Sequence, residues 1–179
     1  QIIKMSGIYL HIPYCKQACH YCDFHFSTTT KGKEKLIQAM HQEIILRKDY
    51  LDNHLVETIY FGGGTPSILS ISELESLLET IAKNFSIVSY PEITLEANPD
   101  DLNLEKLKAI KSIGINRLSV GIQSFHDNEL IMMNRAHQAK DALRCLDQIS
   151  QLFDNYSIDL IYGMPESTTK TWEENLKML

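Results

Sequence analysis

The chain has 179 residues, of which 44% are apolar and 22% are charged, and its formal net charge is −6. This length predicts one sizeable domain, and the composition is ordinary for a globular protein. The negative charge argues against general binding to nucleic-acid backbones, which requires a basic surface. Apolar runs stay shorter than the ~20 residues that cross a bilayer, so no transmembrane segment is expected.

The first residues lead directly into a strand-like segment, so no signal peptide is expected and a cytoplasmic location is predicted. Thiols stay reduced in such a compartment, where closely spaced cysteines more often bind metal than form disulfides. This expectation matters for the four cysteines of the chain, because three of them lie close together.

Five short segments rich in β-branched and aromatic residues are predicted to be strands. They are residues 7–13, 57–63, 92–98, 117–123 and 157–163. Segments with a helical period lie between and after them, at residues 34–52, 72–84, 104–113, 139–153 and 168–179. Ser72 and Glu75 have the spacing of a capping box at the start of the second helix, and Gly114 is a candidate C-cap of the third.

Strands that alternate with helices predict an α/β fold with a parallel sheet and right-handed crossovers. A closed eight-stranded barrel needs ~250 residues, which is more than this chain offers. We therefore expect a partial (β/α) TIM-like barrel that stops after about five strands, with the rest of the barrel and a carboxy-terminal domain outside residues 1–179. The fifth strand would have an uncovered edge, so self-association of this piece through that strand or its terminal helix is predicted.

The sequence CKQACHYC places Cys15, Cys19 and Cys22 in one loop after the first predicted strand. Three cysteines leave one unpaired, which fits a disulfide framework poorly. A zinc site with a neighbouring histidine is an alternative, although structural zinc sites usually join two separate cysteine pairs. An iron–sulfur cubane held by three thiolates would leave one iron open to a ligand, at the sheet edge where α/β proteins bind ligands. Cys145 falls on the apolar stripe of a predicted helix, and we interpret it as a core residue.

A second motif, Gly62-Gly63-Gly64-Thr65-Pro66, follows the second predicted strand. It lacks the G-K-[ST] ending of a phosphate-binding P-loop. A glycine run of this kind forms tight turns, and it also allows backbone groups to approach a ligand closely. The CxxxCxxC loop and this glycine-rich segment together resemble the radical S-adenosylmethionine (SAM) superfamily.

Several segments narrow the resemblance to the oxygen-independent coproporphyrinogen III oxidase family and its close relatives, the radical SAM heme chaperones. They are HIPYCKQACHYCDF, YFGGGTPS, LEANP, SVGIQSF, NRAH and DLIYGMP, and the resemblance runs from Tyr9 to Pro165. The oxidases tend to have a fourth cysteine two residues after the third, where this chain has Phe24. The sequence therefore resembles the heme-chaperone branch.

The resemblance implies that Cys15, Cys19 and Cys22 ligate a [4Fe-4S] cluster whose open iron takes the amino and carboxylate groups of SAM. An electron donor would reduce the cluster, and cleavage of SAM would give methionine and a 5′-deoxyadenosyl radical. The resemblance also implies SAM contacts at positions that match the family. These are Tyr9, Tyr21, Gly63, Gly64, Thr65, Glu96, Gln123, Arg135 and Asp159.

Physical arguments support some of these positions independently. Glu96 ends the third predicted strand, where a carboxylate accepts hydrogen bonds from ribose hydroxyls in dinucleotide sites. Gln123 and Asp159 lie on predicted strands, where a polar side chain is costly to bury without a partner. Polar side chains at these strand positions favour a role in ligand binding over a role in packing alone.

Three functions remain open at this point. The resemblance implies a tetrapyrrole partner, which is heme for a chaperone that binds and delivers it, or coproporphyrinogen III for an oxidase that decarboxylates it. A zinc-stabilised interaction domain is the third hypothesis, so enzymatic activity is not assumed. We expect His20, His25 and His137 to be ordinary polar loop residues, although each could approach the cluster or a tetrapyrrole.

Overall fold

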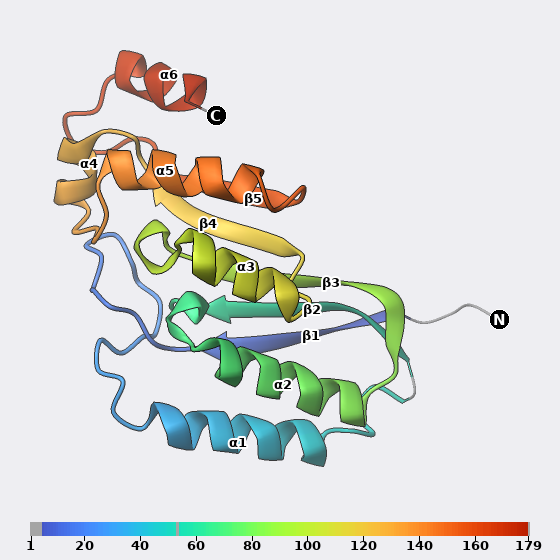
Figure 1. Ribbon diagram of the computed structural model, residues 1–179. Helices are drawn as coiled ribbons and strands as arrows, with labels where there is room; N and C mark the ends of the chain where they lie inside the picture. The colour runs from blue at the N-terminus through green and yellow to red at the C-terminus, as the bar shows by residue number, and fades with distance from the viewer. Residues whose placement is uncertain (1–4, 53, 179) are drawn as a thin grey trace.

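The computed structural model describes residues 5–52 and 54–178. It contains a parallel five-stranded sheet with helices along one face (Figure 1). The strands follow one another in the sheet in chain order and pair in parallel throughout. They are β1 (Met5–Ile12), β2 (Leu55–Gly63), β3 (Ile87–Ala97), β4 (Arg117–Gln123) and β5 (Tyr156–Leu160). This arrangement confirms the predicted partial TIM-like barrel.

Helices lie between successive parallel strands, as crossover connections require, and one more helix follows the last strand. They are α1 (Lys33–Leu46), α2 (Ile71–Asn84), α3 (Leu104–Ser112), α4 (Asp127–Met132), α5 (Ala139–Ser150) and α6 (Thr169–Lys177), with single 3₁₀ turns at Pro66–Ile68 and Pro99–Asp101. Figure 1 shows α1, α2, α3 and α5 side by side on one face of the sheet, while α4 lies beside the carboxyl end of β4. None of these helices is long and apolar enough to cross a membrane.

The two faces of the sheet differ in chemistry because strand side chains alternate. On β1, Leu10 and Ile12 are buried beneath the helices, whereas the Tyr9 side chain points to the other face and is 57% exposed. That other face carries a polar network, in which the Tyr60 hydroxyl donates to Glu96 at 2.8 Å. Burial of each large apolar side chain contributes ~1.5–3 kcal/mol, so the helix-covered face stabilises the fold and leaves the polar face free for binding.

Several predicted boundaries were wrong in detail. The first helix ends at Leu46 and not at residue 52. Its buried apolar stripe contains Ile37 and Ile44, and the charged residues Arg47 and Lys48 interrupt that stripe one turn later. The third strand begins at Ile87, five residues before its predicted start. Helix α4 was not predicted, because its six residues are too few to show a period.

The fifth strand also ends earlier than predicted, at Leu160. Gly163 has a φ of +75°, so the chain has left the extended conformation by that point. β5 lies at one edge of the described sheet, and self-association through this edge remains a prediction.

The capping box predicted at Ser72 and Glu75 was also wrong, because the box lies two residues earlier. The Ser70 hydroxyl accepts from the backbone N–H of Glu73 at 3.2 Å, and the Glu73 carboxylate accepts from the Ser70 N–H at 2.8 Å. With this start, Leu74, Leu77 and Ile81 form the buried stripe of α2. The sequence offers both Ser-x-x-Glu pairs, and the structure uses the one that starts at Ser70.

We expect Ser70→Ala to lower the free energy of unfolding by about 1 kcal/mol, because the N–H of Glu73 loses its acceptor. Ser72→Ala is the matched control and should change stability by less than about 0.5 kcal/mol. Urea unfolding followed by circular dichroism measures both. Equal losses in the two variants would contradict the assignment of the cap.

Candidate cluster and cofactor site

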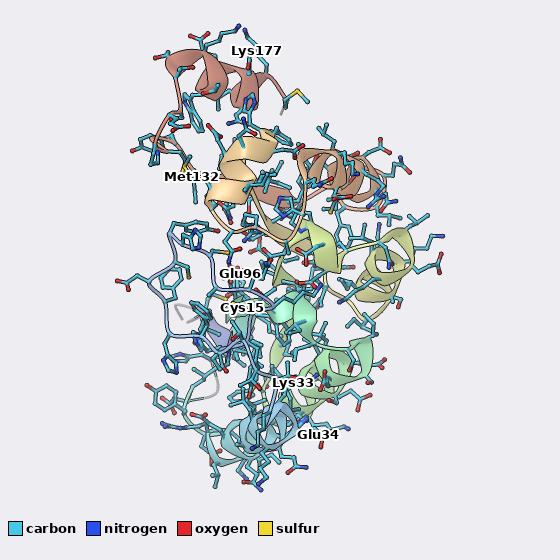
Figure 2. All side chains as sticks on the ribbon, turned by 90° about the vertical axis from the view of Figure 1, so that its left-hand side faces the viewer. Cys15, Lys33, Glu34, Glu96, Met132 and Lys177 are labelled. Atoms are coloured by element: carbon cyan, nitrogen blue, oxygen red, sulfur yellow. The ribbon has the colours of Figure 1, made fainter. Side chains whose placement is uncertain are left out.

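The cysteine loop follows β1 at the edge of the sheet where the parallel strands end. Two backbone hydrogen bonds close its base. The N–H of Cys15 donates to the Ser27 carbonyl at 3.0 Å, and the N–H of Ser27 donates to the Pro13 carbonyl at 2.9 Å. Figure 2 faces this edge and shows Cys15 and Glu96 near its middle, between Lys33 of α1 and Met132 of α4. The loop therefore lies over the carboxyl ends of the strands, as the motif predicted.

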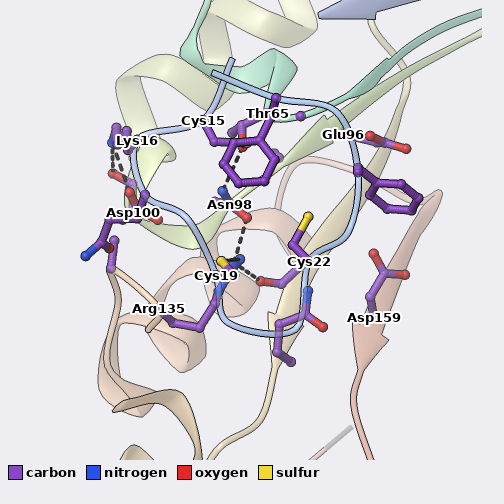
Figure 3. A pocket seen from close by; sticks show the side chains of 18 of the residues that line it. Cys15, Lys16, Cys19, Cys22, Thr65, Glu96, Asn98, Asp100, Arg135 and Asp159 are labelled. Atoms are coloured by element: carbon purple, nitrogen blue, oxygen red, sulfur yellow. Dashed lines mark hydrogen bonds and ion pairs between the residues drawn. The ribbon is translucent and has the colours of Figure 1, made fainter. Parts of the chain in front are cut away.

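A cavity of about 220 Å³ lies beneath this loop (Figure 3). Its wall brings together the three loop cysteines and eight of the nine other predicted site residues. These eight are Tyr21, Gly63, Gly64, Thr65, Glu96, Gln123, Arg135 and Asp159. Residues from the ends of β2, β3, β4 and β5 thus converge on one volume with the cysteine loop.

Tyr9 is the predicted site residue that does not line this cavity. Its ring stacks on Tyr60 with 5.9 Å between the centroids, and its hydroxyl lies 3.0 Å from Nδ1 of His11. Its role near the cluster therefore stays a prediction.

The glycine-rich turn closely approaches the chain that enters the cysteine loop. The N–H of Gly64 donates to the Ile12 carbonyl at 2.8 Å, and the N–H of Thr65 donates to the Tyr14 carbonyl at 2.7 Å. A Cβ atom on Gly64 would lie 2.7 Å from the Tyr14 oxygen and 3.0 Å from Sγ of Cys15. Any side chain here would displace the loop, so the structure explains the need for glycine.

Gly63 has a different reason to be glycine. Its φ is +116°, which side-chain-bearing residues rarely adopt. A Cβ atom on Gly63 would also lie 2.8 Å from Nδ1 of His11 and 3.0 Å from the backbone nitrogen of Ile12. Backbone conformation and close approach to β1 therefore both exclude a side chain.

Three carboxyl groups line the cavity, Glu96 on β3, Asp159 on β5 and Asp100 in the turn after β3. Asp100 pairs with Lys16 at 2.9 Å, which leaves Glu96 and Asp159 for a ligand. Burial raises the pKa of Glu96, although its hydrogen bonds from the Tyr60 hydroxyl and the Gly63 N–H at 3.0 Å oppose this shift. The nearby Asp159 carboxylate raises the pKa of Glu96 further, and burial also raises the pKa of Asp159 itself. Both groups present oxygen acceptors of the kind that bind ribose hydroxyls.

Arg135 offers an unused donor inside the site. Its Nε is buried and has no hydrogen-bond partner among the residues that the structure describes. Its other nitrogens are engaged, with Nη2 donating to the Gly121 carbonyl at 2.7 Å and Nη1 to the Tyr21 hydroxyl at 3.2 Å. A buried donor without a partner is costly, and the positive charge of Arg135 in the cavity wall would attract a carboxylate ligand.

Gln123 lies at the end of β4 with a φ of +70°, which is rare for a residue other than glycine. Its side chain is folded back over Gly121, where an added Cβ would lie 2.8 Å from its amide nitrogen. Strained conformations of this kind cluster at functional sites. The strain agrees with the predicted binding role of Gln123 but does not by itself test it.

A second connection fixes the cysteine loop to the segment after α4. His20 reaches this segment twice, from its N–H to the Met133 carbonyl at 3.1 Å and from Nδ1 to the Met132 carbonyl at 2.9 Å. Asn134 donates to the Ala18 carbonyl at 2.8 Å. This clamp was not predicted, although Asn134 lies in the NRAH segment on which the resemblance partly rests.

His137 lies in the loop between α4 and α5, as expected, but its side chain is buried and only 3% exposed. Its Nε2 lies 3.1 Å from the Ile122 carbonyl. Burial is the main reason that the pKa of His137 is lowered, so its imidazole is neutral near neutral pH. Its contact with the Ile122 carbonyl attaches the loop to β4. His25 is exposed.

Cys145 is confirmed as a core residue on α5, with 2% of its surface exposed. Burial raises the pKa of its thiol to about 12. The cysteines of the loop are only half-buried and border the cavity. The four thiols therefore differ strongly in access to solvent.

In metal-free protein, iodoacetamide at pH 8 should modify the three loop cysteines well before Cys145. The reactive species is the thiolate, which a buried thiol with a high pKa does not form. Peptide mass spectrometry at timed intervals measures the order of modification, and the same reaction in guanidinium chloride gives the unfolded control. Early modification of Cys145 in native protein would contradict its burial.

The donor set fits an iron–sulfur cubane. In the described part of the chain, no three His, Cys, Asp or Glu side chains converge as they would around a single metal ion. A cubane differs from such an ion because each thiolate binds its own iron. Three half-buried thiols on one loop, over a cavity with a side-chain-free wall at Gly63 and Gly64, match that requirement.

The radical SAM superfamily model matches residues 9–179. The chain belongs to the radical SAM superfamily. Membership in the radical SAM superfamily implies a [4Fe-4S] cluster and SAM as cofactors. The motifs at Cys15–Cys22 and Gly62–Pro66 therefore predicted the family correctly.

Similar radical SAM proteins confirm the resemblance to the heme chaperones and coproporphyrinogen oxidases. The heme chaperone HemW of Bacillus subtilis is 38% identical over 96% of this chain and 46% of its own length. A bovine protein named radical S-adenosyl methionine domain-containing protein 1, mitochondrial, is 35% identical over 98% of this chain and 40% of its own. The solved coproporphyrinogen III oxidase HemN of Escherichia coli is 30% identical, with a TM-score of 0.87 over 97% of this chain and 40% of that one. This radical SAM chain thus spans less than half the length of these relatives.

Proposed function

We propose that this chain forms the cluster- and SAM-binding part of a heme chaperone, a radical SAM protein that binds heme and delivers it. The cavity that joins the CxxxCxxC loop to the ends of four strands carries this proposal. The similarity to HemW of Bacillus subtilis supports the choice of heme as the ligand. The proposal includes an electron donor that reduces the cluster and a cytoplasmic location.

Phe24 favours the chaperone over the oxidase. It lies two residues after Cys22, where the oxidases tend to have a fourth cysteine, and it is 75% exposed. Its ring borders the cavity without contributing a ligand atom. The alternative is coproporphyrinogen III oxidation, which the similarity to the fold of HemN keeps open.

Each part of the cavity has a role in this proposal. Cys15, Cys19 and Cys22 would hold the cluster. The backbone of the glycine turn would bind the amino group of SAM, and the positive charge of Arg135 would attract its carboxylate. The reduced cluster and bound SAM together would supply one-electron chemistry.

The remaining cavity residues would bind the nucleoside part of SAM. Glu96 and Asp159 would accept hydrogen bonds from the ribose hydroxyls, and the Tyr21 ring would contact the adenine. Burial raises the pKa of the Tyr21 phenol to about 12, so it stays neutral and keeps its proton near neutral pH. The protein would thus orient SAM and exclude water from it.

Heme titration of the full-length protein, reconstituted anaerobically with iron and sulfide, tests the proposal. We expect a broad cluster absorption near ~400 nm before titration and a saturable heme spectrum during it. Conversion of coproporphyrinogen III to protoporphyrinogen IX, with reductant and SAM present, would favour the oxidase instead. A colourless protein with stoichiometric zinc would overturn both in favour of an interaction domain.

A further inference from the structure

Asn98 connects two parts of the site, although the sequence analysis did not assign it a role. It follows β3 directly and borders the cavity. Its amide nitrogen donates to Oγ1 of Thr65 at 3.2 Å, and its amide oxygen accepts from Nη2 of Arg135 at 2.6 Å (Figure 3). The side chain therefore bridges the glycine turn after β2 and the segment after α4.

Both neighbours of Asn98 also point a donor at a cysteine sulfur. The Thr65 hydroxyl donates to Sγ of Cys15 at 3.4 Å. Nη1 of Arg135 donates to Sγ of Cys19 at 3.5 Å. One amide thus lies at the centre of a hydrogen-bond chain that ends on two of the three proposed cluster ligands.

The direction of the hydrogen bonds in this chain follows from the chemistry of each group. An amide side chain can donate and accept at the same time, which neither a carboxylate nor an aliphatic side chain can do. Because the Asn98 nitrogen occupies a lone pair of the Thr65 oxygen, the single proton of that hydroxyl is free for sulfur. The Asn98 oxygen meanwhile fixes one arm of the Arg135 guanidinium, so the other arm faces Cys19.

The backbone holds Asn98 in place. Its N–H donates to the Ser67 hydroxyl at 3.3 Å, and its carbonyl accepts from the N–H of Asp101 at 3.0 Å. Ser67 in turn donates to the Asp101 carboxylate at 2.6 Å. The amide is thus attached to a rigid turn.

We propose that Asn98 is a positioning residue that keeps the Thr65 and Arg135 donors on the cluster cysteines and thereby sets the reduction potential of the cluster. Hydrogen bonds to cluster sulfurs favour the more negative, reduced state and so raise the potential. Asn98 touches neither sulfur itself and acts through its two neighbours. The inference rests on the cluster and not on heme, so it can fail or hold independently of heme binding.

The test is the midpoint potential of the reconstituted full-length protein, measured by redox titration with EPR detection. Asn98→Ala removes both bridges, and Thr65→Val removes the donor to Cys15 while keeping the side-chain shape. Both variants should shift the potential to more negative values. A variant that combines Asn98→Ala with Thr65→Val should shift the potential by less than the sum of the two single shifts. Both changes act on the same hydrogen bond, from Thr65 to the Cys15 sulfur. Asn155→Ala, on the exposed surface before β5, is the matched control and should leave the potential unchanged.

Asn98→Asp keeps the test decisive if the alanine variant assembles less iron. A carboxylate cannot donate to the Thr65 hydroxyl and instead offers it an acceptor, which turns its proton away from Cys15. Thr65→Val should therefore add no further shift in the Asn98→Asp background. The inference is overturned if Thr65→Val shifts the potential as much in the Asn98→Asp background as in the wild type. An unchanged potential in Asn98→Ala with a full iron content overturns it as well. A wild-type protein that assembles no cluster overturns the cofactor assignment and this inference together, whereas loss of heme binding alone overturns only the proposed function.

Discussion

Alanine at Cys15, Cys19 or Cys22 is expected to abolish assembly of the four-iron cluster. With three protein thiolates in total, the loss of any one leaves two irons without a protein ligand, and a cubane is normally held by four thiolates. Iron and sulfide counts per chain after anaerobic reconstitution, together with absorption near ~400 nm, measure the outcome. We expect near-complete loss in each of the three variants.

Cys145→Ala is the matched control for this experiment. Its thiol is buried on α5 against the sheet and does not border the cavity, so the variant should keep its full iron content. Its cost should be limited to stability, at about 1 kcal/mol for a small change in the core. Iron loss in the Cys145 variant equal to that in the loop variants would contradict the ligand assignment.

Gly63→Val is expected to weaken SAM binding at least about tenfold, equivalent to about 1.4 kcal/mol, while the cluster still assembles. A Cβ at Gly63 would clash with the His11 ring and the Ile12 backbone nitrogen, so the turn has to shift, and with it the cavity wall that Gly63 forms. The valine would also be strained at a φ of +116°, which costs about 1–3 kcal/mol of stability. SAM titration monitored by the EPR spectrum of the cluster measures the affinity, and thermal unfolding measures the stability.

Gly114→Val separates the two effects of the Gly63 substitution. Gly114 also has a positive φ, of +95°, but nothing lies within 4 Å of an added Cβ. The Gly114 variant should therefore show the stability cost of a strained φ without the clash, and it should keep its affinity for SAM. Wild-type SAM affinity in the Gly63 variant would show that the turn is only structural.

The order and type of the main elements were readable from the sequence because they depend on local patterns. Strand-like segments that alternate with helical segments leave few topologies besides a parallel sheet. The cysteine spacing and the glycine run were equally readable, since both belong to single loops at strand ends. Parallel strands end at one edge of the sheet, so these loops had to lie near each other.

The contacts between those loops could not be read in the same way. Asn98, Thr65 and Arg135 are separated by 33 and 37 positions in the chain, and no local pattern relates them. The clamp between Ala18 and Asn134 spans 116 positions. Such pairs form only when the packing of helices on the sheet fixes where each loop lies.

Choices between equivalent local signals also required the tertiary structure. Ser70 and Ser72 both offer a capping box, and the structure uses Ser70, whose partner Glu73 also pairs with Lys33 of α1 at 2.8 Å. Tyr9 and Tyr21 both matched family positions, yet the cavity includes Tyr21 and not Tyr9. The sequence by itself determined the chemistry that the loops carry, because residue type and spacing are local. The tertiary structure decided which side chains meet and which donors reach the cysteine sulfurs, because those contacts depend on how separate loops pack at the sheet edge.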